Sequence, residues 1–146
     1  MTTTPLPPLI SSSVYGPLGV RHLPRLWLKI LLHACGRLPE GYRHGAGGFD
    51  EALTTALGID RDAFVEYISD EKPGYLALEA WVRAHATNLT PEAVTTLNAG
   101  IEAAQLPEAM REARFERVGY SDPSYTGSVA LNDLDDWTAI HEFLIR

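Results

Sequence analysis

The sequence predicts an all-α fold, a compact orthogonal bundle of five to seven helices in a single domain. Three observations support this fold class. Apolar residues recur at helical spacing along most of the chain, and Pro and Gly fall where helices would begin and end. Alternating strand patterns are scarce, with residues 125–131 as the only faint candidate. The length of 146 residues suits one domain.

Residues 1–18 are rich in Thr, Pro and Ser, and we expect them to form an extended or loosely ordered N-terminal arm. Residues 19–146 are then the helical domain. The apolar stretch PLPPLI in the arm is suited to packing on a neighbouring subunit, so a homodimer is one possible partner arrangement.

The first predicted helix runs from about Pro24 to Cys35. Pro24 suits the first turn, where its missing N–H is not needed, and Gly36 suits the position after the last turn. Apolar side chains cover most of its circumference, so we expect a central helix that is buried on nearly all sides. One polar stripe remains, and we expect it to face water or a cleft. The stripe consists of His22, Arg25, Lys29 and His33.

Six further helices are expected after this one. The clearest start signal is Thr90 as N-cap before Pro91, with Leu89 and Val94 placed to form a hydrophobic staple. Trp27, Trp81 and Trp137 fall at helix positions typical of core residues. The expected ranges are 50–57, 60–68, about 73–86, a helix from 91, 107–118, and a last helix from about 132 or 133.

Charge is distributed unevenly along the chain. Up to residue 48 there are five bases against one acid, whereas the remainder holds 18 acids against 7 bases. The net charge of −7 argues against general nucleic-acid binding, because phosphate contacts need a large basic surface. No apolar stretch is long enough for a membrane span, and the N-terminus does not resemble a secretory signal. The single Cys35, expected to be buried, fits a cytoplasmic location.

The basic N-terminal third is the best candidate for a ligand site. Guanidinium groups match carboxylate and phosphate geometry, so a small anion is the expected ligand. The alternative is internal pairing, above all with Asp135 and Asp136, which the sequence places in the first turn of the last helix. The candidate ligand-binding residues are Arg21, Arg25, Lys29 and Arg43.

Candidates for catalysis are weaker, because the chain carries no recognisable catalytic or metal motif. His44 with Tyr42 and Asp50 is one possible proton-transfer set, since a carboxylate can orient a histidine base. His22 and His33 lie about 16 Å apart on a helix, too far to share a metal ion. We expect no metal and no cofactor, and we interpret the glycines of HGAGG as a turn rather than a phosphate loop.

Several short motifs resemble a family of small bacterial proteins known as domain of unknown function 5069. The resemblance covers residues 15–85 well and the Asn132–Trp137 segment less closely. It implies a helical fold and an intracellular bacterial origin, but it implies no reaction and no catalytic residues. The motifs are Leu23-Pro24-Arg25, Gly36-Arg37-Leu38, Gly41-Tyr42 with Gly47-Gly48, Phe49-Asp50, Leu57-Gly58-Ile59-Asp60 and Glu79-Ala80-Trp81-Val82.

Three functional hypotheses follow. The first is a helical binding or interaction module whose basic cleft holds a small anion or an acidic segment of a partner. The second is a small enzyme that acts on an anionic metabolite by acid–base chemistry. The third is a purely structural protein. Convergence of the basic residues with Tyr42 and Asp50 on one pocket would favour the first two.

Overall fold

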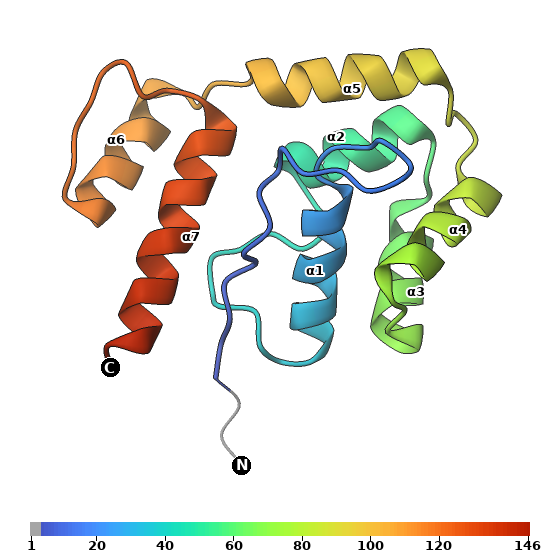
Figure 1. Cartoon of the computed structure of the whole chain (residues 1–146), viewed down its shortest axis with the longest axis horizontal. Coiled ribbons are helices and arrows are strands. Elements are labelled where there is room, and N and C mark those ends of the chain that lie inside the picture. The colour runs from blue at the N-terminus through green and yellow to red at the C-terminus, as the bar shows by residue number, and fades with distance from the viewer. Residues whose placement is uncertain (1–3) are drawn as a thin grey trace.

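The all-α prediction is confirmed by a computed structural model, which describes residues 4–146. Seven helices lie within that range, and the only β-pairing there is an isolated bridge between Gln105 and Gly127 (Figure 1). The helices are α1 (Leu23–Ala34), α2 (Gly48–Leu57), α3 (Arg61–Glu71), α4 (Tyr75–His85), α5 (Pro91–Ala103), α6 (Glu108–Val118) and α7 (Ser128–Leu144).

Helix α1 is the central element, as its apolar circumference predicts. It packs against α3 and α4, and its Leu23, Leu26 and Ile30 are fully buried. Most of the polar stripe does not face water, because His22, Arg25 and Lys29 are at most 6% exposed, whereas His33 at its end is exposed. Two cations therefore lie inside the protein, and each needs an internal partner.

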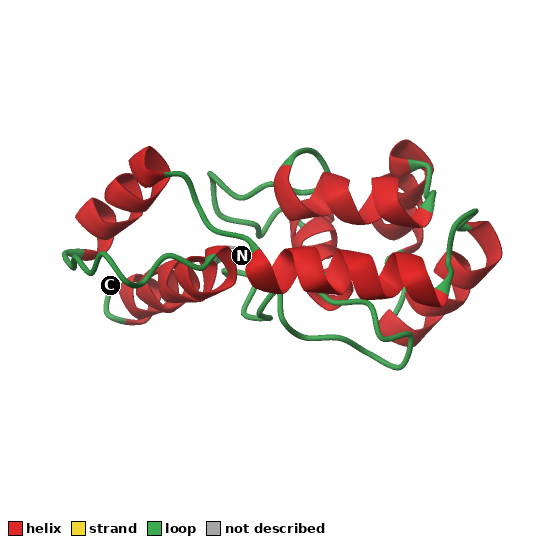
Figure 2. Cartoon of the chain, turned by 90° about the horizontal axis from the view of Figure 1, so that it is seen from above, coloured by secondary structure: helices red, strands yellow, loops and turns green. Residues whose placement is uncertain are grey.

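The hydrophobic core belongs to the part of the chain that ends with α5. Its buried cluster begins at Val20 and ends at Ile101, and α5 lies alongside α2 on one side of it (Figures 1 and 2). Helices α6 and α7 pack on each other beside this body, and we call them the α6–α7 hairpin. Helix α7 packs against α5, but the buried core cluster contains no residue of the hairpin.

Local signals place most helix ends correctly. Thr90 caps α5 by accepting a hydrogen bond from the Ala93 amide at 3.1 Å, and Asp60 caps α3 in the same way at 3.0 Å. Helix α2 stops at Gly58, whose φ of 64° is the left-handed conformation that glycine adopts without strain.

The start of α7 was predicted wrongly. The helix begins at Ser128 rather than near residue 132, because no helix-breaking residue follows Gly127. Asp135 and Asp136 therefore lie within the helix and not in its first turn. Trp137 is also not a core residue, since it is 58% exposed, whereas Trp27 and Trp81 pack against the core.

Cys35 is exposed, contrary to the sequence-based expectation. Helix α1 ends at Ala34, so Cys35 is its C-cap, beyond the buried turns. The apolar residues that precede it in sequence therefore do not enclose the thiol.

The N-terminal arm is not helical between residues 4 and 18, and residues 1–3 lie outside the described residues. The arm is nevertheless attached to the body. The Leu6 amide donates to the Arg37 carbonyl at 2.8 Å, and the Leu18 amide donates to the Glu79 carboxylate at 3.1 Å. Pro7 and Pro8 are buried, and Leu9 is exposed. Within residues 4–146, no helix has the length and apolar character needed to span a bilayer.

We predict that truncation of the α1 core costs far more stability than truncation of the exposed tryptophan. Leu26→Ala should lower the free energy of unfolding by about 2–5 kcal/mol, because it leaves a cavity in a fully buried site. Trp137→Ala, as control, should change it by about 0.5 kcal/mol or less. Urea denaturation of both variants tests this, and equal losses would contradict the placement of α1.

Candidate functional site: a basic cavity beside α1

A cavity of about 780 Å³ opens between α1, the loop of residues 37–48 and the α6–α7 hairpin. Its lining includes both cations of α1 and the side chains of Tyr42, Arg43 and Asp50. The structure thus brings together most of the residues that the sequence analysis singled out. Arg21 and His44 do not line it.

Asp50 is the partner of Lys29. Its Oδ1 accepts hydrogen bonds from His22 Nε2 at 2.6 Å and from Lys29 Nζ at 2.7 Å. Its Oδ2 accepts from Lys29 Nζ at 2.9 Å and from the Gly45 amide at 3.0 Å. Asp50 is 1% exposed, so burial opposes its charge, but the bonds from His22 and Lys29 prevail and hold its pKa below the ordinary value.

His22 occupies a strained position before α1. Its φ of 73° is left-handed, a conformation that costs a non-glycine residue about 1–2 kcal/mol. The surrounding contacts hold it there. Nδ1 lies 2.9 Å from Ser12 Oγ, and the ring meets Phe49 edge-on at 5.5 Å. Burial lowers the pKa of His22, so the ring is neutral at pH 7, with Nε2 donating to Asp50 and Nδ1 accepting from Ser12.

Asp136 is the partner of Arg25. The two side chains form a bidentate pair with N–O distances of 2.6 and 3.2 Å, and both are nearly inaccessible to water. Tyr42 donates a third hydrogen bond to Asp136 Oδ1 at 2.9 Å. Burial, followed by the nearby Asp136 charge, raises the pKa of Tyr42, so its phenol stays protonated. These contacts attach α7 to both α1 and the 37–48 loop.

Internal pairing therefore accounts for three of the four predicted ligand-binding cations. Arg25 pairs with Asp136, Lys29 pairs with Asp50, and Arg21 lies away from the cavity, 2.8 Å from Glu102 of α5. The fourth, Arg43, is exposed and has no acidic partner among residues 4–146.

The proposed proton-transfer set does not assemble. His44 stacks on His33 with ring centroids 3.7 Å apart, whereas Tyr42 contacts Asp136 and Asp50 contacts His22. His22 takes the place beside Asp50 that the sequence analysis gave to His44. No group of three or more candidate metal ligands occurs in the described part of the chain.

Arg114 is the site residue that sequence reasoning missed. It extends from α6 into the cavity, is half-buried, and donates to Asn132 Oδ1 at 2.9 Å. No carboxylate in residues 4–146 pairs with it, and burial lowers its pKa. The neighbouring Arg117 pairs instead with Asp135. Arg111 of the same helix does not line the cavity, and Arg117 lines it but has a carboxylate partner, so only the tertiary structure distinguishes Arg114 from these two arginines.

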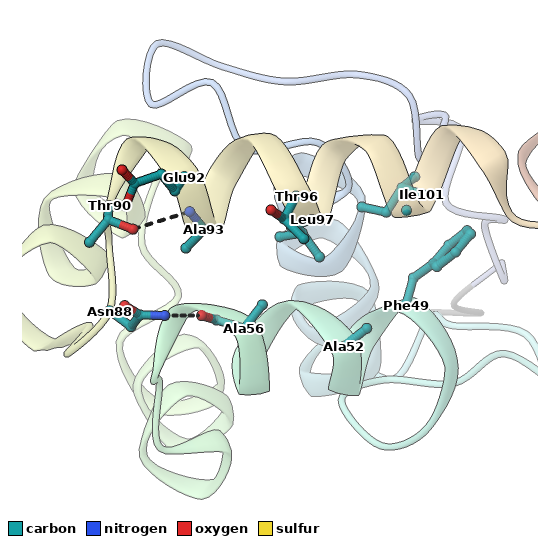
Figure 3. A pocket seen from close by; sticks show the side chains of 11 residues that line it. Phe49, Ala52, Ala56, Asn88, Thr90, Glu92, Ala93, Thr96, Leu97 and Ile101 are labelled. Atoms are coloured by element: carbon teal, nitrogen blue, oxygen red, sulfur yellow. Dashed lines mark hydrogen bonds between the residues drawn. The ribbon is translucent and has the colours of Figure 1, made fainter.

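A second hollow of about 700 Å³ lies between α2 and α5 (Figure 3). Small side chains such as Ala52, Ala56 and Ala93 line it, and none of its lining residues is basic. Phe49 is a lining residue of both hollows. The basic cavity is therefore the one that can attract an anion.

The motifs around α1 resemble the DUF5069 family, and a comparison of the chain with known protein families finds the same family. The family described as "Domain of unknown function (DUF5069)" matches residues 11–137, which is most of the chain. The protein belongs to this DUF5069 family. The match extends from the N-terminal arm into α7 and includes both acids that pair with the cations of α1. No curated protein matches the chain.

We predict that Asp136→Asn destabilises this DUF5069 protein far more than Asp135→Asn. The first change leaves Arg25 buried without a carboxylate, at a cost of about 3–5 kcal/mol. The second removes a more exposed pair and should cost about 1 kcal/mol or less. Chemical denaturation gives these values, and hydrogen exchange should show the Asp136→Asn loss concentrated in the α6–α7 hairpin. Indistinguishable variants would contradict the role of Asp136.

We also predict that acid destabilises the fold through His22. The pKa of His22 is lowered in the folded state, so the unfolded chain takes up the proton more readily below about pH 6.5. The free energy of unfolding should therefore fall as the pH drops from 7 toward 5. Exposed His33, whose pKa is also lowered, adds to this trend. His22→Gln should make the free energy of unfolding less dependent on pH, whereas His141→Gln, at an exposed position, should not. Urea denaturation at several pH values measures this dependence. Equal pH dependence in wild type and His22→Gln would contradict the role of His22.

Proposed function

We propose that the protein is a binding module whose basic cavity holds an anionic ligand, with Arg43 and Arg114 as the groups that meet the ligand's negative charge. The observation that carries this proposal is Arg114, a half-buried guanidinium that lines the cavity and has only the neutral Asn132 as a side-chain partner.

The argument from Arg114 rests on the cost of burying a charge. A guanidinium that is partly removed from water loses hydration, and a neutral amide replaces only part of it. Arg25 and Lys29 show how this protein compensates buried cations elsewhere, since each has a carboxylate within 2.7 Å. Arg114 lacks such a carboxylate. A carboxylate or phosphate group of a ligand would supply the missing negative charge.

Arg43 supports the proposal from the opposite wall. Its guanidinium lies over Gly47, where an added Cβ would be 3.5 Å from Arg43 Cζ. Gly47 and Gly48 line the cavity at the start of α2, and no side chain caps that helix start within the described residues. The free N–H groups of a first turn carry partial positive charge and favour an anion.

An enzyme that acts on an anionic metabolite by acid–base chemistry is the second candidate, because Asp50 and Tyr42 line the same cavity. Both groups already have structural partners. Asp50 accepts four hydrogen bonds, and Tyr42 donates to Asp136 with a raised pKa. Binding without chemistry therefore agrees better with their environment. As part of the proposal we place the protein in the cytoplasm, where its single exposed Cys35 would remain a thiol.

We predict that an anion raises the melting temperature and that Arg114→Gln reduces this increase at the same anion concentration. Inorganic phosphate and a panel of carboxylated and phosphorylated metabolites serve as probes in a thermal-shift screen, followed by calorimetry. Loss of a charge-assisted contact worth about 1.5–3 kcal/mol should weaken binding roughly tenfold or more. Arg61→Gln, an exposed position on α3, is the matched control. If no anion on the panel binds, or if Arg114→Gln binds like wild type, the proposal fails.

A further inference from the structure

The lining of the cavity extends along most of α7. The residues that α7 contributes recur every three or four positions, so they form one face of the helix. Ser128 and Glu142 lie at opposite ends of that face, about 21 Å apart along the axis at about 1.5 Å per residue. This face is Ser128, Asn132, Asp135, Ala139 and Glu142.

One small anion would occupy only part of such a cavity. Three arginines of the lining have no carboxylate partner in the described chain: Arg43 of the 37–48 loop, Arg114 of α6, and Arg146 after α7, which lies over the Phe143 ring at 4.9 Å. Arg43 and Arg114 thus come from different elements. Met110 and Phe143 add apolar atoms to the lining. A ligand that uses the whole cavity therefore needs more than one acidic group and an apolar part.

The polar side chains along α7 favour a particular kind of ligand. A hydrocarbon chain would desolvate Ser128, Asn132 and Glu142 without replacing their hydrogen bonds. A peptide backbone offers both donors and acceptors along its length. The Asn132 amide nitrogen is suited to meet one of its carbonyls, because it donates to no other residue in the described chain. A nucleic acid is disfavoured, because it carries a phosphate at every nucleotide and some would face Glu40, Asp135 or Glu142, whereas a peptide can carry acidic side chains opposite the arginines alone.

We propose that the anionic ligand is an extended peptide segment of a partner protein, about six residues long, with two acidic side chains and one apolar side chain. The length follows from about 21 Å at about 3.3 Å per extended residue. The acidic side chains meet Arg43 and Arg114, and the apolar one packs on Met110 and Phe143. This inference rests on the proposed function, because it names the class of ligand for the same cavity.

The experiment is a selection of random heptapeptides displayed on phage against the immobilised full-length protein. We expect enriched sequences with at least two Asp or Glu and an apolar residue. The double variant Arg43→Gln/Arg114→Gln should enrich none of them. Arg61→Gln/Arg83→Gln, at two exposed positions away from the cavity, should enrich the same sequences as wild type. Unchanged melting temperatures confirm that each variant is folded.

Titration of the most enriched peptide against free glutamate and inorganic phosphate separates the possible outcomes. We expect the peptide to bind at least tenfold more tightly than either small anion, and to lose at least tenfold in affinity in Arg43→Gln/Arg114→Gln. If glutamate or phosphate binds as tightly and depends on the same arginines, the peptide inference is wrong and the anion-binding function stands. Enrichment of only basic or apolar peptides, or of none, also overturns the inference. If in addition no anion binds, the proposed function falls with it.

Discussion

The structure depends on two cations that are buried with one helix. Helix α1 is apolar around most of its circumference, so the other elements enclose it, and Arg25 and Lys29 are enclosed with it. A buried cation is stable only beside an anion. Asp136 and Asp50 supply the two carboxylates, from α7 and from the first turn of α2. The burial of α1 thereby determines where α2 and α7 lie.

The same pairing gives the cavity its chemistry. Asp50 neutralises Lys29, Asp136 neutralises Arg25, and Asp135 pairs with Arg117. Three arginines of the cavity wall then remain without an acid in the described chain: Arg43, Arg114 and Arg146, of which Arg146 lies over the Phe143 ring. The buried core cluster contains no residue of the α6–α7 hairpin. The hydrogen bonds of Asp136 to Arg25 and Tyr42 are therefore the contacts that hold α7 beside the cavity. The contacts that stabilise the fold thus also shape the cavity in which we propose that an anion binds.

The parts of the fold that the sequence predicts are those governed by local signals. Thr90 and Pro91 mark the start of α5, and the apolar circumference of α1 predicts its burial. The sequence also raised pairing between the N-terminal arginines and Asp136. The sequence alone does not decide between that pairing and a ligand site. Arg25 and Asp136 are 111 positions apart, and only the packing of the helices brings them together. For the same reason Arg114 and its unpaired charge were missed, and Trp137 was wrongly assigned to the core.

A double-mutant cycle on Arg25 and Asp136 tests the central claim most directly. Arg25→Met and Asp136→Leu each leave one buried charge without a partner, whereas the double variant leaves none. The account predicts that the double variant is more stable than either single variant, with a coupling free energy of about 2 kcal/mol or more. Losses that simply add, with the double variant the least stable of the three, would contradict it.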